Sequence, residues 1–159
     1  MPDIVVDGKT RVAYVPTIAN IAAPTTAELN AGMLLQSTLT ASGLAGFAPD
    51  TAKVDTSSLA STFNTAVNGK SSFDGTQLTL KKQTGTDTIH DTLVRGTTGY
   101  IVIRRSIAES TNWATSQKVS VYPIECGETI YLDPEENSVE RYTIPLTVSS
   151  SPNQRATVA

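Results

Sequence analysis

The sequence has few of the residues on which enzymes and metal proteins rely. It contains one cysteine and one histidine in 159 residues, and charged residues make up only 17% of the chain. A single cysteine excludes a disulfide within the chain and suits folding in a reducing compartment. Zinc needs three or four histidine or cysteine ligands, and this chain offers two at most. We therefore expect no bound metal and no cofactor.

Basic residues and long apolar runs are also scarce. Fifteen acidic residues outnumber twelve lysines and arginines, which gives a net charge of −3. This balance argues against tight nucleic-acid binding, which needs a basic surface, but it allows a surface past which nucleic acid slides. No segment approaches 18 consecutive apolar residues, and the N-terminus lacks a charged-then-apolar signal pattern. We expect a soluble protein that does not insert into membranes and is not secreted by that route.

Serine and threonine are abundant instead, at 39 of 159 residues. Threonine favours the pleated surface of strands, and serine competes with helices for backbone partners. The length fits one domain, and folding hides roughly two-thirds of the surface of a chain of this size, which is enough for one core. We therefore predict one mainly β domain over residues 1–159.

Two neighbouring segments should form the centre of the sheet. Tyr100–Arg105 and Lys118–Tyr122 have the composition of strands and are joined by a polar loop around Trp113. The first four residues, Tyr100–Ile103, leave no polar face, so this strand should be covered on both sides. The second cover is either the chain's own helix or another subunit. Trp113 is either an anchor for a partner or a local core plug, and the sequence leaves both open.

Alternating apolar and polar residues predict the last long strand, Val139–Val148. Pro145 removes one backbone donor there, so we expect a bulge or an edge position. The other expected strands are Ile4–Val6 and Arg11–Val15, joined by an Asp7-Gly8 turn, and Ser72–Lys82. We expect residues Gly43–Lys70 to form a strand and a long loop, with a possible turn at Asn68-Gly69, and Asn153–Ala159 to form a C-terminal tail.

Two short helices are predicted. Thr25 and Glu28 have the spacing of a capping box, which starts a helix near Thr26. The second helix, Thr88–Arg95, should be capped by Thr86 or Asp87 and should lay an apolar stripe of Ile89 and Leu93 across a sheet. Two helices and about seven strands predict a β-sandwich or open barrel with one flanking helix.

Catalysis would have to use His90, the one histidine. A Ser-His-Asp arrangement would take Asp87 or Asp91 as the orienting acid. However, the sequence has no G-x-S-x-G turn, and a helical residue beside Asp91 is ordinarily exposed. We therefore expect no enzyme activity and assign no catalytic residue, with a small hydrolase based on His90 as the weakest alternative.

An acidic segment and two basic doublets could be binding sites, but a simpler explanation is favoured for each. Asp133, Glu135 and Glu136 lack the alternating ligands and central glycine of a calcium loop, which favours a solvated turn. Lys81-Lys82 and Arg104-Arg105 could touch phosphate, yet such doublets at strand ends are more often solvated or paired with carboxylates of a neighbour. We assign no metal-binding or cofactor-binding residue.

Six runs of sequence carry a resemblance to a known family: Arg11–Gly32, Leu80–Thr88, Arg95–Arg105, Val121–Glu128, Pro134–Tyr142 and Arg155–Ala159. They resemble the major tail protein, or tail tube protein, of long-tailed, non-contractile phages that infect actinobacteria. The resemblance covers nearly the whole chain and is weakest over Asp50–Ser72. That family has no catalytic residues to carry over.

The resemblance implies a subunit of a phage tail tube. In that family a β-sandwich with one flanking helix assembles as six-fold rings, sheets of neighbouring subunits join into one β-barrel around a lumen, and the rings stack. The implied partners are further copies of the chain, the tape-measure protein, and the tail terminator and distal tail proteins, with DNA only in transit. The implied location is the tail of the virion, after assembly in the cytoplasm of the bacterial host.

A tail tube subunit would use its polar strand faces and irregular segments for the lumen and for contacts between subunits. Polar strand faces at Gln77/Thr79, Ser120 and Thr143/Thr147 are candidates to line the lumen, with Lys118 on the face of Ser120. Gly43–Lys70 and both termini would contact the adjacent subunit or ring. The alternative is a monomeric β-sandwich that serves as a binding or decoration module of a virion.

Overall fold

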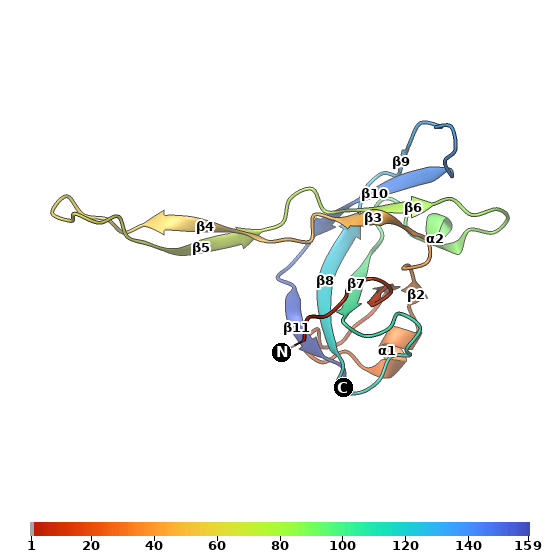
Figure 1. Cartoon of the computed structure of the whole chain (residues 1–159), viewed down its shortest axis with the longest axis horizontal. Coiled ribbons are helices and arrows are strands. Elements are labelled where there is room, and N and C mark those ends of the chain that lie inside the picture. Colours follow the sequence, from red (N-terminus) through yellow and green to blue (C-terminus); the bar gives the residue numbers. More distant parts are fainter. Residues whose placement is uncertain (1) are drawn as a thin grey trace.

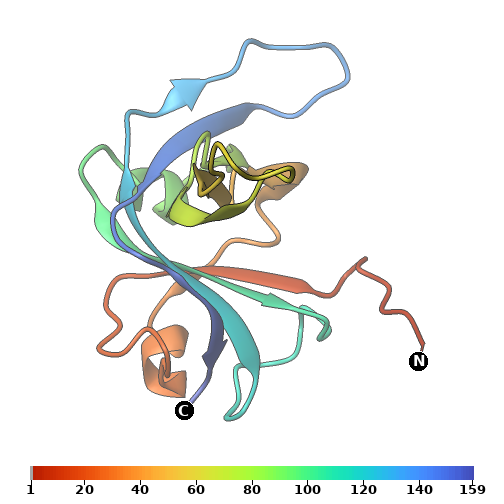
Figure 2. The same cartoon turned by 90° about the vertical axis from the view of Figure 1, so that its left-hand side faces the viewer.

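A computed structural model describes residues 2–159, in which the chain forms eleven strands and two five-residue helices (Figure 1). Nine strands belong to one antiparallel sheet, which curls into half a barrel, and two form a separate hairpin (Figure 2). The prediction of a mainly β, open-barrel fold is confirmed. The elements are β1 (Thr10–Val15), α1 (Thr26–Asn30), β2 (Met33–Leu34), β3 (Leu39–Ala45), β4 (Asp50–Asp55), β5 (Ala66–Ser72), β6 (Gln77–Lys81), α2 (Thr88–Thr92), β7 (Thr98–Arg105), β8 (Lys118–Cys126), β9 (Ile130–Tyr131), β10 (Arg141–Val148) and β11 (Asn153–Thr157).

The strands of the large sheet run in the order β2-β1-β7-β8-β10-β6-β3. β11 pairs with β8, and β9 pairs with β10. The sheet therefore ends at β2 on one side and at β3 on the other, and it does not close on itself. Each end strand presents backbone groups that a further strand can pair with.

β7 lies at the centre of the lower part of the sheet, between β1 and β8. Successive side chains of a strand point to opposite faces. Ile101 and Ile103 accordingly enter one apolar cluster, while Val102 enters a second cluster on the other face. All three are buried, which confirms that this strand is covered on both sides.

The first cluster fills the inside of the curl. It is formed by the facing halves of the sheet, with Phe47 and Leu93 closing it. The second cluster is covered by α1 through Leu29, by Trp113 and by the C-terminal Ala156 and Val158. Both covers thus come from the same chain, which settles the alternative between a helix and another subunit in favour of the chain itself.

The two helix starts follow the sequence signals. Glu28 donates its N–H to Thr25 Oγ1 at 3.2 Å, and Thr25 donates its N–H to Glu28 Oε1 at 3.0 Å, so the capping box is present. Asp87 caps α2 by accepting the N–H of His90. This helix ends at Thr92 rather than at Arg95, because Leu93 leaves the helical conformation and is buried in the core.

Several predicted segments differ from the structure. The Asp7-Gly8 turn is present, but Ile4–Val6 form no strand in the described chain. The expected loop in Gly43–Lys70 is instead the hairpin of β4 and β5, and Asn68-Gly69 lies inside β5 opposite Lys53 rather than at a turn. These strands bury neither face, so they lack the alternation by which strands are recognised.

Predicted segments in the C-terminal half of the chain also differ from the structure. Asn153–Ala159 is not a free tail, because β11 pairs with β8 and buries Ala156. β8 continues through Pro123 to Cys126, and Ser72 belongs to β5 rather than to β6. Pro145 marks neither a bulge nor an edge: β10 pairs with β6 up to Pro145 and with β8 from Leu146 onward, so the proline stands where the strand changes partners.

No helix within residues 2–159 combines the length and the apolar composition that a membrane crossing requires.

Replacing Leu29 by alanine tests whether α1 stabilises the second face. Leu29 is the buried residue of α1, so the substitution leaves a cavity over β7 and should lower the free energy of unfolding by about 2–5 kcal/mol. Urea unfolding measures the change. The control Val94→Ala removes an exposed side chain and should change stability by less than about 0.5 kcal/mol; equal effects of the two would contradict this role of α1.

Candidate assembly surfaces

The hairpin of β4 and β5 leaves the body of the protein and projects as an arm (Figure 1). Its strands pair from Asp50↔Ser72 to Asp55↔Ala66, and beyond them Thr56 donates its N–H to Thr65 at 2.9 Å. An isolated two-stranded hairpin is marginally stable in water. The arm therefore gains little stability from contacts of its own.

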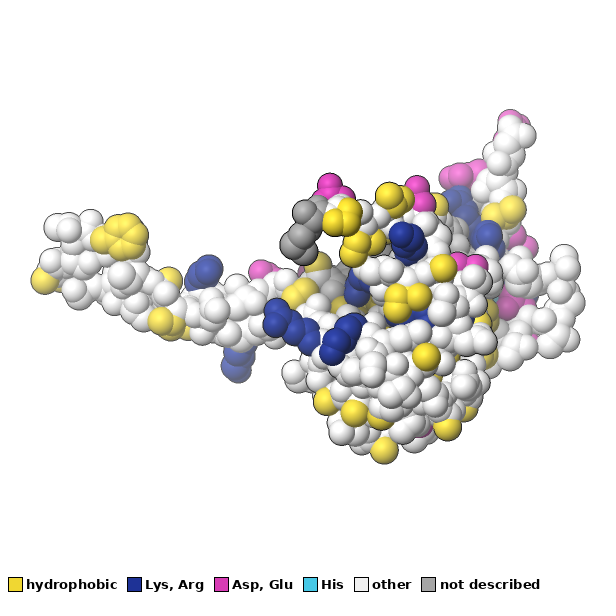
Figure 3. Space-filling view, turned by 60° about the horizontal axis from the view of Figure 1, so that its bottom comes forward, with side chains coloured by type: hydrophobic (Ala, Val, Ile, Leu, Met, Phe, Trp, Pro, Cys, Tyr) yellow, Lys and Arg dark blue, Asp and Glu magenta, His cyan; other side chains and the backbone are white. Residues whose placement is uncertain are grey.

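Apolar side chains lie along this arm without cover. Val54 and Val67 face each other across the two strands and are half exposed, while Leu59 and Phe63 near the tip are exposed. In Figure 3 hydrophobic side chains are spread along the arm, with Lys and Arg side chains where the arm meets the body. Apolar groups gathered on one projection indicate a contact surface rather than scattered exposure.

The N-terminal arm, residues 2–9, is a second uncovered segment. Ile4, Val5 and Val6 are 60%, 66% and 72% exposed, and Asp3 and Asp7 flank them. Figure 2 shows this segment running away from the body. Its base is fixed, because Gly8 adopts a positive φ of 69° and accepts the N–H of Glu109 at 2.9 Å.

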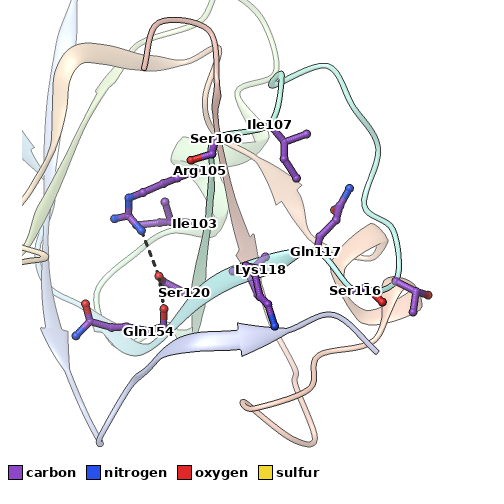
Figure 4. A pocket seen from close by; sticks show the side chains of 11 residues that line it. Ile103, Arg105, Ser106, Ile107, Ser116, Gln117, Lys118, Ser120 and Gln154 are labelled. Atoms are coloured by element: carbon purple, nitrogen blue, oxygen red, sulfur yellow. Dashed lines mark hydrogen bonds between the residues drawn. The ribbon is translucent and has the colours of Figure 1, made fainter. Parts of the chain in front are cut away.

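An open hollow of about 590 Å³ lies on the concave face of the sheet, between the ends of β7 and β8 and the loop that joins them (Figure 4). Arg105 Nη1 donates to Ser120 Oγ at 3.2 Å, and Lys118 Nζ donates to Thr157 Oγ1 at 2.7 Å. The partly exposed Ile107 contributes an apolar side chain, and the nearly buried Ile103 and Val119 form part of the lining. The hollow thus combines two cations with an apolar lining.

Arg104, in contrast, is not a surface cation. It is fully buried, and its guanidinium donates to the carbonyls of Ala108 and Asn112 at 2.9 and 3.3 Å and to Gln117 Oε1 at 3.1 Å. The expectation that Arg104 is solvated or paired with a neighbour's carboxylate is wrong. Its role is to hold the loop between β7 and β8 in place.

Trp113 is the local core plug, and the alternative of a partner anchor is wrong, because its side chain is only 6% exposed. Arg11 and Arg104 lie opposite each other on β1 and β7, and their guanidinium carbons approach the indole to 4.9 and 5.2 Å. Burial lowers the pKa of Arg104, the charge of Arg11 lowers this pKa further, and Glu109 offsets part of the shift. The indole face and the loop carbonyls compensate two like charges at close range.

Replacing Arg104 by methionine tests this loop anchor. The change removes the buried donor of the hydrogen bonds to the carbonyls of Ala108 and Asn112 and to Gln117 Oε1, and it should destabilise the protein by about 1–3 kcal/mol in urea unfolding. The matched variant Arg105→Met affects an exposed side chain and should change stability by less than about 0.5 kcal/mol. A loss for Arg105→Met as large as that for Arg104→Met would contradict the assignment.

His90 does not form a catalytic arrangement. Its Nε2 lies 2.8 Å from the Tyr131 hydroxyl, and its Nδ1 lies 3.4 Å from Asp91 Oδ1. Asp87 accepts the backbone N–H of His90 instead of orienting the ring. Both ring nitrogens are thus engaged without a serine, and the contacts tie β9 to α2, with the ring also packed edge-on against Tyr142.

Asp87 ties α2 to the preceding loop. Burial alone would raise the pKa of this carboxyl, but the N–H groups of Gln83 and His90 and the charge of Lys82 bring the pKa below its ordinary value of 3.8. A depressed pKa in the folded state stabilises the protein above pH 3.8, and this contribution disappears as the pH falls through the lower folded value.

The variant Asp87→Asn should therefore unfold about 1 kcal/mol more easily than the unmodified protein at pH 7, and the difference should shrink as the pH falls below 4. Urea unfolding at a series of pH values measures it. Asp91→Asn, on the exposed side of the same helix, provides the control. A difference between Asp87→Asn and the unmodified protein that stays constant down to pH 3 would exclude this linkage.

The acidic segment after β9 is a surface turn. Glu135 pairs with Arg141 at 3.0 Å, and no group of three or more His, Cys, Asp or Glu side chains among residues 2–159 could hold a metal ion.

The polar strand faces expected to line a lumen fall on two sides of the sheet. The hydroxyls of Thr79 and Thr143 approach to 3.1 Å on the convex side, opposite the core residues of β6 and β10. Ser120 and Lys118 lie on the concave side, in the hollow described above. The two sets therefore lie on opposite faces of the sheet, and which of them faces a lumen stays a prediction.

These features define a class of protein first: a mainly β protein built on one curled, unclosed antiparallel sheet with a projecting hairpin. A family model described as phage tail tube protein matches residues 1–159, and the chain belongs to this family. It is therefore a structural protein of a phage tail, which places it in the virion. The predicted membership of the phage tail tube protein family is confirmed.

Solved structures agree with the fold. A chain in the cryo-EM structure of the anti-feeding prophage baseplate, 6-fold symmetrised, is similar with a TM-score of 0.64 and 9% sequence identity over 96% of each chain. A search of curated protein sequences gives no match.

Proposed function

We propose that this chain is the major subunit of a tail tube that self-assembles into stacked hexameric rings. The rings enclose a channel that holds the tape-measure protein before infection and conducts genomic DNA into the host cell. Residues 1–159 form one tail tube domain without enzyme activity. Membership of the tail tube family over the whole chain is the observation that carries the proposal.

The open sheet supports ring formation. The large sheet ends at β2 and β3, and joining the sheets of neighbouring subunits would pair such free strands in a closed ring. The structural relative comes from a 6-fold symmetrised assembly, which agrees with a hexamer.

The two arms support stacking. The β4–β5 hairpin buries nothing of its own, and its exposed Leu59 and Phe63 would be covered by an adjacent subunit or ring.

The net charge of −3 suits a channel along which DNA passes without being held, because affinity for phosphate rises with each Lys or Arg contact.

The finer assignment rests on the sequence resemblance. The six matching runs favour a long, non-contractile tail of a phage that infects actinobacteria. The tail terminator and distal tail proteins would bind the two ends of the tube, and assembly would take place in the cytoplasm of the host.

Negative-stain electron microscopy of the purified protein tests this proposal, with six-fold rings or tubes as the expected result. The double variant Leu59→Ser/Phe63→Ser should reduce tube formation at least about tenfold while leaving the unfolding free energy of the monomer unchanged, since both side chains are exposed.

Val94→Ser, an exposed apolar residue of the body, is the matched control and should assemble normally. A protein that stays monomeric at high concentration would overturn the proposal and favour the decoration module.

A further inference from the structure

No segment among residues 2–159 fills the hollow on the concave face, although its chemistry is specific. Arg105 and Lys118 lie at the ends of the paired strands β7 and β8, and within the described part of the chain each donates only to a hydroxyl. The ion pairs formed within residues 2–159 involve Lys82, His90 and Arg141 instead. Two neighbouring cations with no carboxylate in the lining, beside the partly exposed Ile107, favour an acidic and apolar ligand.

The N-terminal arm has the complementary chemistry. Three consecutive β-branched apolar residues, Ile4–Val6, are largely exposed, and Asp3 precedes them. Burying these three side chains would remove the most exposed apolar run outside the hairpin. Burial of this kind stabilises a complex by about 25 cal/mol per Å² of apolar surface, before the costs of association.

The arm does not reach the hollow of its own copy. The turn at Asp7-Gly8 is held by a bond from Lys9 N–H to the Val6 carbonyl at 3.0 Å and by the bond from Glu109 N–H to the Gly8 carbonyl. These bonds direct the segment away from the body (Figure 2). Asp3 is exposed and lies on the side of this turn away from the body.

We propose that the hollow of one copy receives the N-terminal arm of a second copy, with Ile4–Val6 on its apolar lining and Asp3 beside Arg105 and Lys118. Ile107 and Gln117 lie across the hollow from Arg105 and Gln154, so an extended segment fits between the two sides (Figure 4). The inference rests on the proposed self-assembly and adds to it the site and the segment that join two subunits.

Cross-linking of two singly substituted proteins tests the contact between copies. Val5→Cys is mixed with Gln154→Cys under mild oxidation, and a disulfide-linked dimer is expected. The native Cys126 does not interfere, because it is buried and because burial, with the charge of Glu125, raises its pKa to about 11. Mixing Val5→Cys with Ser138→Cys, on the exposed turn after β9, is the control and should give no dimer.

Charge reversal tests the ion pair. Asp3→Lys alone, and Arg105→Glu with Lys118→Glu, should each raise the concentration needed for assembly about tenfold at low salt, and the three changes together should restore it. Asp133→Lys, an exposed carboxylate elsewhere, should have no effect. Circular dichroism confirms that each variant is folded, so that loss of assembly is not loss of structure.

The outcomes separate the two proposals. Tubes that form with neither a cross-link nor a charge effect would overturn the arm contact and leave the tube function intact. A disulfide that forms only within a chain carrying both Val5→Cys and Gln154→Cys would show that the arm folds onto its own copy, which also overturns it. If the unmodified protein does not assemble, the tube proposal fails; a cross-linked dimer would then still support the arm contact, and its absence would count against it.

Discussion

Burial of β7 on both faces is the constraint from which most of the architecture follows. A strand with no polar side chain between Tyr100 and Ile103 cannot leave either face in water without a large loss of hydrophobic stabilisation. The curl of the sheet brings β6 and β10 over one face, and α1, Trp113 and the C-terminal residues close the other. The C-terminal residues therefore become core elements, which explains why Ala156 and Val158 are buried.

The second cover introduces charge into the interior. Arg11 and Arg104 lie on paired strands at the margin of the apolar cluster, and burying two guanidinium groups is costly unless each is compensated. The loop after β7 compensates Arg104 through the carbonyls of Ala108 and Asn112. It compensates Arg11 through the carbonyls of Glu109 and Thr111, and the indole of Trp113 lies against both guanidinium groups. Fixing this loop also shapes the hollow, whose far wall the same loop provides. A buried charge thus sets the form of a surface site.

The sequence predicted the parts of the fold that depend on local patterns. The capping box at Thr25, the cap at Asp87 and the doubly covered β7 were predictable, since spacing and composition determine them directly. The β4–β5 hairpin was not, because its strands bury nothing and therefore carry no alternation. Similarly, a buried Arg104 cannot be distinguished from an exposed one by its neighbours, because its partners are carbonyls of a loop whose path only the tertiary structure fixes.

The candidate assembly surfaces in Gly43–Lys70 and at the N-terminus were expected only through the family resemblance, because their residue types carry no chemical signature. A catalytic site leaves residue types in the sequence, whereas an interface made of exposed valine, isoleucine, leucine and phenylalanine resembles an ordinary loop until the structure shows that nothing covers it. The hairpin and the N-terminal arm share this property: each lacks a core of its own and leaves the body at an ordered base. A segment that is costly to expose and directed outward would gain stability from contact with other molecules. In the proposed tail tube those molecules would be further copies of the same chain, so the subunit surface that is least stable alone would be the one that assembly completes.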